Sequence, residues 1–232
     1  MTEKTHLSSV LKSVEKPGRY TGGEYNRVMK DKAAVKCRFA FCFPDTYEIG
    51  MSNLGVRILY DVLNRDPDIW CERAYAPWTD MKERMETYGL PLTAVESGDP
   101  VSDFDIVGFS LHYELCYPTF LGMLKLAGLP LLSSERGEDG PIILGGGPCT
   151  FNSEPVADFF DLFNIGEGEE VLHEIVRLYI RMKEDGAYTR TAFLRAAAGI
   201  EGVYVPSLYE VHYHEDGTLY PYVPKYPDVP TR

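Results

Sequence analysis

The sequence lacks three features, and each absence removes a class of protein. No stretch approaches the ~18 consecutive apolar residues of a membrane-spanning helix. The N-terminus mixes acids and bases without an apolar core, so it is not a signal peptide. Basic residues are scarce, because 23 Lys and Arg stand against 35 Asp and Glu, giving a net charge of −12. We therefore expect a cytoplasmic protein that contacts neither nucleic acid nor a membrane.

Closely spaced cysteine pairs are also missing. The five cysteines show neither the CxxC spacing that holds zinc nor a CxxxCxxC run that holds an iron–sulfur cluster. We expect no metal site built from them, and thiols that stay reduced in the cytosol. The five are Cys37, Cys42, Cys71, Cys116 and Cys149.

What is present, from about residue 35 onward, is an alternation of short apolar runs with helical patterns. The composition, 44% hydrophobic and 25% charged, is that of an ordinary globular protein. Predicted strands cover 35–43, 70–76, 104–111, 141–144 and 162–165, and predicted helices cover 52–64, 80–88, 115–127, 169–183 and 191–198. Ser52 is available to cap the first of these helices.

This alternation predicts an α/β fold, with a doubly wound, flavodoxin-like, mostly parallel five-stranded sheet and right-handed crossovers. We expect the α/β domain over residues 35–185. Residues 1–34 form an N-terminal arm with a short amphipathic helix. Residues 186–232 hold a small helix, a β-hairpin that turns at 214–217 and a proline-rich linker.

In such a sheet, ligands bind beyond the carboxyl ends of the strands, so the loops there are the candidates. The triple glycine 145–147 follows a buried strand, and glycine lets the backbone approach a bulky flat or phosphorylated ligand closely. A tight turn without a ligand is the alternative. The segment 166–169 also follows a strand, and its spacing matches neither a Walker loop nor a GxGxxG fingerprint. His112, at the end of a buried strand, favours a structural histidine over a ligand.

Taken together, these loops resemble a known family. Residues 45–50, DTYEIG, resemble the DxHxxG signature of cobalamin-binding domains with Tyr47 in place of the histidine. Ser110-Leu111 and the triple glycine fall where that family has its SxL and GG elements. The phrases RYTGGEYN, PDTYEIGMSNLG, FDIVGFSLHYEL, GGGP and IGEGEE are similar to the N-terminal part of radical SAM proteins that carry a cobalamin-binding-type domain. The similarity spans residues 17–225.

The resemblance implies a module that binds cobalamin and presents the corrin to a radical SAM barrel. That barrel, with its 4Fe–4S cluster and S-adenosylmethionine, is expected downstream in a full-length protein, and no catalytic residue is expected in this chain. The implied cofactor-binding residues are Asp45, Tyr47, Gly50, Met51, Ser52, Ser110, Leu111, Tyr113, Gly145, Gly146, Gly147, Pro148, Gly166, Glu167 and Gly168. Because tyrosine, with a pKa of about 10, is no neutral nitrogen ligand, we expect base-off cobalamin with no histidine below the cobalt and with Tyr47 packing near the lower face.

Tyr47 leaves a second hypothesis open, a degenerate domain of the same fold that has lost the cofactor and positions a substrate or partner. A flavin or phosphoacceptor domain is disfavoured. The third strand ends in Ser110 without an acid, and the loop after the first strand carries the bulky Tyr47, Glu48 and Met51 where a phosphate cradle would need small residues.

Overall fold

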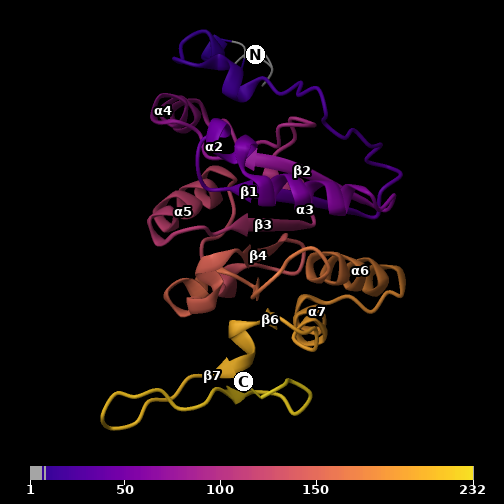
Figure 1. Ribbon diagram of the computed structural model, residues 1–232, viewed down its shortest axis with the longest axis vertical. Helices are drawn as coiled ribbons and strands as arrows, with labels where there is room; N and C mark the ends of the chain where they lie inside the picture. Colours follow the sequence, from indigo (N-terminus) through magenta and orange to yellow (C-terminus); the bar gives the residue numbers. More distant parts are fainter. Residues whose placement is uncertain (1–6, 8, 232) are drawn as a thin grey trace.

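The protein folds around a six-stranded sheet, which confirms the predicted α/β class (Figure 1). The computed structural model describes residues 7 and 9–231. The strand order is β2-β1-β3-β4-β5-β6. The strands are β1 (Cys37–Phe43), β2 (Ile69–Tyr75), β3 (Ile106–Ser110), β4 (Ile142–Gly146), β5 (Leu162–Asn164) and β6 (Val203–Tyr204). The first five are parallel, as predicted, and the two-residue β6 joins the edge antiparallel to β5.

Helices cover both faces of this sheet. They are α2 (Tyr47–Ser52), α3 (Leu54–Asn64), α4 (Thr79–Tyr88), α5 (Tyr117–Leu126), α6 (Val171–Glu184) and α7 (Arg190–Ala197). The crossovers β1 to β2 and β3 to β4 run in opposite directions along the sheet, so right-handed connections put α3 and α5 on opposite faces. Helix α6 packs against α3 and β1, and α5 lies on the other side in Figure 1. In the described part of the chain, no helix has the length and apolar character to cross a membrane.

Aromatic rings hold the middle strands at a fixed spacing. Phe109 on β3 meets Phe120 on α5 at 5.8 Å between ring centroids, Phe120 meets Phe160 at 4.9 Å, and Phe160 meets Phe163 on β5 at 4.8 Å. All four side chains are buried, and each contributes roughly 1.5–3 kcal/mol of hydrophobic free energy. This packing connects β3 and β5 through α5.

The predicted start of the first helix was wrong. The N-cap of α3 is Asn53, whose Oδ1 accepts a hydrogen bond from the Val56 N–H at 3.0 Å. Ser52 instead ends the short helix α2, and its hydroxyl donates to the carbonyl of Ile49 at 2.9 Å. Helix α2 occupies the loop after β1, so Ser52 is inside a helix and cannot cap the next one.

The N-terminal arm covers the β2 edge of the sheet. Of the predicted amphipathic helix, residues 7 and 9–11 are helical, and position 8 lies outside the described residues. Val10 and Val14 are buried in the main core. Farther along, the Val28 N–H donates to the Tyr60 hydroxyl at 2.7 Å, and the Trp70 indole donates to the Val28 carbonyl at 3.1 Å. These contacts attach the arm to α3 and β2.

The predicted C-terminal hairpin is also confirmed. Strand β7 (Tyr209–Glu210) pairs antiparallel with β8 (Val223–Pro224), and the turn closes where the Gly217 N–H donates to the His214 carbonyl at 2.9 Å. The proline-rich tract that follows contacts the domain. Asp228 forms an ion pair with Arg195 of α7 at 2.6 Å, and the side chain of Val229 is buried.

Candidate functional site at the carboxyl edge of the sheet

A cavity of about 170 Å³ opens at the carboxyl edge of the sheet, beside α3 and α6. The chain reverses its direction of strand addition between β1 and β3, and ligands of doubly wound sheets bind at that switch point. We call this space the sheet-edge cavity. Six of the residues predicted from the sequence line it, namely Ser110, Gly146, Gly147, Gly166, Glu167 and Gly168.

The glycines at the end of β4 differ in their surroundings. Gly147 has φ +99°, and a Cβ there would lie 2.8 Å from the carbonyl oxygen of Leu111, so backbone geometry requires glycine. A Cβ on Gly146 would have no heavy atom within 4 Å. The Leu111 N–H donates to the Gly146 carbonyl at 2.7 Å, so the loops after β3 and β4 are joined. The space beside Gly146 is therefore open within a fixed frame.

Polar groups in the sheet-edge cavity come from β3 and β5. The Ser110 hydroxyl and His112 Nε2 are 2.8 Å apart, and the His112 ring packs on Phe43 with centroids 4.9 Å apart. Burial lowers the pKa of His112, so its imidazole is neutral at pH 7. Asn164 is 3% exposed, and its Oδ1 has no hydrogen-bond partner among the described residues.

The sequence pattern predicts a structural role for His112, and Asn164 is not among the residues predicted to line the cavity. The hydrogen bond to Ser110 agrees with a satisfied histidine, although the ring also lines the cavity. A usable signal for Asn164 was its polarity at the end of an otherwise apolar strand.

The charge in the sheet-edge cavity disfavours anions. Among the described residues that line it there is no Lys or Arg, whereas Glu167 and Glu169 are both present. Aromatic and aliphatic side chains of β1 and α3, including Phe39, Phe41 and Leu59, supply an apolar wall. The arrangement suits a flat, uncharged group better than a phosphate.

Asp45 and Tyr113 bridge the switch point. The Tyr113 hydroxyl donates to Asp45 Oδ2 at 3.1 Å, and the Thr46 N–H donates to Asp45 Oδ1 at 2.7 Å. The hydrogen bond to Asp45 raises the pKa of Tyr113, and partial burial adds to it. The loops after β1 and β3 are thus held together above the sheet, although Tyr113 itself is largely exposed.

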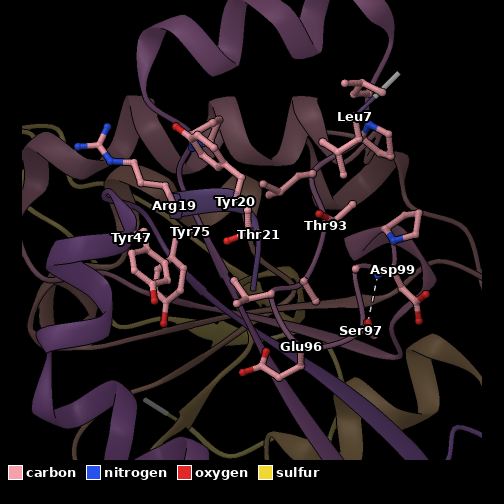
Figure 2. Close-up of a pocket in the computed structure, with 18 of the residues that line it drawn as sticks. Leu7, Arg19, Tyr20, Thr21, Tyr47, Tyr75, Thr93, Glu96, Ser97 and Asp99 are labelled. Carbon is pink, nitrogen blue, oxygen red and sulfur yellow. Dashed lines mark hydrogen bonds between the residues drawn. The ribbon is translucent and has the colours of Figure 1, made fainter. Parts of the chain in front are cut away.

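Tyr47 lies away from the sheet-edge cavity. It lines a second cavity of about 640 Å³ beneath the N-terminal arm, which we call the arm cavity (Figure 2). Its hydroxyl donates to Glu24 Oε1 at 3.0 Å, and its ring meets that of Tyr75 edge-on at 5.6 Å between centroids. Burial and the neighbouring Glu24 carboxylate raise the pKa of Tyr47. The structure therefore separates Tyr47 from the loops that follow β3, β4 and β5.

The other predicted residues shape the backbone and do not line the sheet-edge cavity. Gly50 packs so closely on the Tyr75 ring that no Cβ would fit, and Met51 Sδ accepts from the Tyr75 hydroxyl at 2.9 Å. Gly145 lies against Phe163, where a Cβ would be 2.6 Å from the ring. Leu111 is fully buried, Ser52 ends α2, and the exposed Pro148 begins the turn of 3-10 helix at Pro148–Asn152.

No metal centre is formed by the described residues, since no three His, Cys, Asp or Glu side chains gather closely enough. All five cysteines are free thiols, and four of them are buried.

Comparison with known proteins identifies the family to which this chain belongs. A family profile described as "Radical SAM proteins, N-terminal" matches residues 55–206, more than half of the chain. The chain belongs to that family. The matched region contains the loops after β3, β4 and β5, and the loop carrying Asp45 and Tyr47 precedes it.

One relative is similar over 140 residues at 26% identity, the uncharacterized protein MJ0966 of Methanocaldococcus jannaschii. The similarity covers 59% of this chain and 26% of the relative, so the chain spans about a quarter of that relative's length. No solved structure matches the chain.

Proposed function

We propose that this domain is a cobalamin-binding-type module of a radical SAM protein, with the sheet-edge cavity taking the flat base of the cofactor's nucleotide tail. The observation that carries the proposal is the gathering of Ser110, Gly146, Gly147 and 166–168 around one cavity. These residues come from the paired ends of β3 and β4 and from the loop after β5, which the parallel sheet brings to one edge.

The residues fit such a group in three respects. The open space at Gly146 admits a ring beside the backbone. The apolar wall and the absence of Lys or Arg from the described lining suit an uncharged ring. The buried Asn164 side chain adds a polar group to the lining.

In this proposal Tyr47 is not a metal ligand, because its hydroxyl is already committed to Glu24 and its ring faces the arm cavity. The corrin would be held base-off, with no side chain from position 47 below it. Asp45 and Tyr113 would keep the loops after β1 and β3 at a constant separation. The bound corrin would supply methyl transfer or another radical reaction, whereas this chain's residues bind and orient.

The catalytic partner would be a radical SAM domain of the same full-length protein, which would hold the 4Fe–4S cluster and S-adenosylmethionine. Support comes from membership in a family described as N-terminal in radical SAM proteins. We place the protein in the cytoplasm, consistent with five free thiols.

A second candidate is a cofactor-free domain that positions a substrate or partner for the same catalytic domain. A specific observation favours it, because Asp45 and Tyr47, the two signature side chains, already have hydrogen-bond partners within the protein.

Incubation with hydroxocobalamin, followed by desalting and a visible spectrum, distinguishes the two candidates. Retention of about one corrin per chain supports the cobalamin module. Loss of all corrin absorbance from a fully folded protein overturns it and leaves the cofactor-free domain.

A further inference from the structure

The arm cavity shares no lining residue with the sheet-edge cavity, and none of the functions above uses it. Its walls come from the N-terminal arm, the end of β2, helix α4 and residues 90–100 (Figure 2). Its volume of about 640 Å³ lies within the roughly 300–1,000 Å³ typical of small-molecule sites.

The arm that roofs this cavity is attached at several points. The Glu15 N–H donates to Asp80 Oδ2 of α4 at 2.7 Å, and Glu24 accepts from Tyr47. Gly22 approaches the Val95 carbonyl so closely that a Cβ would not fit. With anchors on α4, α2 and the 90–100 segment, the cavity is a fixed feature of the fold.

Apolar and aromatic side chains form its main walls. Met81 and Met85 of α4 are buried and line one side. Tyr47 and Tyr75 line another (Figure 2), and their rings meet edge-on. Methionine and tyrosine both make favourable contacts with aromatic rings, so these walls suit a ring-containing apolar body.

Among the described residues that line the cavity, the charge left without an ion-pair partner is positive. Glu96 is occupied, because its two oxygens accept from the Arg73 N–H and Nε, each at 2.7 Å. Asp99 is also occupied, through ion pairs with Lys32 and Arg38. Arg27 lines the cavity and is exposed, and among the described residues it has no ion-pair partner. An anion at the rim would therefore meet an uncompensated guanidinium.

We propose that the arm cavity binds a small organic anion with an apolar, ring-containing body. The ring lies between the α4 methionines and the paired tyrosines, and the anionic group meets Arg27. This site is independent of corrinoid binding at the sheet-edge cavity, so either proposal can fail without the other.

The test uses two fluorescent probes of nearly the same shape, anilinonaphthalene sulfonate and its neutral parent anilinonaphthalene. We expect saturable binding of one sulfonate per chain. Thr93→Trp, which places an indole in the cavity, should lower the affinity for the sulfonate at least about tenfold. Thr87→Trp, on the exposed side of α4, is the matched control and should leave the affinity for the sulfonate unchanged. Should Thr93→Trp unfold the protein, Thr21→Trp at the cavity's exposed rim replaces it.

The charge preference is tested by Arg27→Gln, with Arg57→Gln at an exposed position of α3 as its control. Arg27→Gln should weaken the sulfonate about fivefold and leave the neutral probe unchanged. Unchanged sulfonate binding in the cavity-filling variants overturns the site. Equal effects of Arg27→Gln on the binding of both probes, or no effect on either, would contradict the proposal that Arg27 binds an anionic group of the ligand.

Discussion

The Tyr47 hydroxyl donates a 3.0 Å hydrogen bond to Glu24, and this contact joins the start of α2 to the N-terminal arm. In the sequence resemblance to cobalamin-binding domains, position 47 corresponds to the histidine of their signature. Here the residue contributes to the attachment of the arm and to the wall of the arm cavity. The resemblance at position 47 therefore concerns its place in the sequence only, because the side chain has a different structural role.

Tyr47→Phe removes that hydrogen bond and leaves both oxygens of Glu24 without a donor, because Oε2 already lacks one among the described residues. We expect the free energy of unfolding to fall by about 1 kcal/mol, measured by urea denaturation. Glu24→Gln keeps an acceptor for Tyr47 and should cost less. An equal or larger loss in Glu24→Gln would contradict the assigned role of the hydrogen bond.

Two of the glycines predicted as site residues should differ in their tolerance of alanine. Gly50→Ala forces a methyl group into the Tyr75 ring and should destabilise the fold by roughly 1–3 kcal/mol. Gly146→Ala places its methyl in open space and should change stability by no more than about 0.5 kcal/mol. Thermal melts of the two variants compare them directly. Similar losses in both would show that the space beside Gly146 is not open.

Asp161, just before β5, should be a sensitive charged residue of the fold. Its Oδ2 accepts from Arg190 at 2.6 Å, from Arg136 at 3.2 Å and from the Ile143 N–H at 2.7 Å, and all three side chains are buried. Asp161→Asn leaves two buried guanidinium groups without their counter-charge, so we expect a loss of about 3–5 kcal/mol in chemical denaturation.

Asp158→Asn, three residues earlier and exposed, is the control and should be nearly neutral. A mild effect of Asp161→Asn, comparable to that of the control, would mean that water reaches the two arginines.

Stability should decline in alkaline solution. Burial raises the pKa of Tyr117 and of Tyr188 to about 12, whereas an unfolded tyrosine titrates at about 10. A group with a raised folded pKa stabilises the fold fully below the unfolded value and loses that contribution as pH rises toward the folded value.

The free energy of unfolding should therefore fall as pH rises from about 10 toward 12, with tyrosinate absorbance appearing along with unfolding. Urea titrations across this interval measure it. Tyrosinate absorbance that develops fully near pH 10 in the folded protein would contradict the burial argument.

Local pattern predicted much of the fold because the central strands are apolar on both faces. The run 104–111 yielded β3, and the stripe of apolar residues over 169–183 yielded α6. Strand β6 has two residues and exists through its pairing with β5, so no local period could reveal it. Helix α2 was missed because six residues containing a glycine resemble a loop.

The candidate site was predictable only in part. Glycines after apolar strands indicated the loops around Gly146 and Gly166, and the structure brings these together. The direction of Tyr47 depends on Glu24, which lies 23 residues earlier in the arm, and no spacing rule carries that information. Asn164 gained its importance from burial and a missing partner, which only the folded chain reveals.

The most direct test of the proposed cobalamin module is an equilibrium titration of hydroxocobalamin into the natural chain, Gly146→Val and the exposed control Gly137→Val. The valine at 146 would project into the sheet-edge cavity, whereas the one at 137 meets open solvent. The proposal predicts binding to the natural chain and to Gly137→Val, with affinity lowered at least about tenfold in a folded Gly146→Val. Absence of binding to the natural chain, or equal affinity in all three, would contradict it.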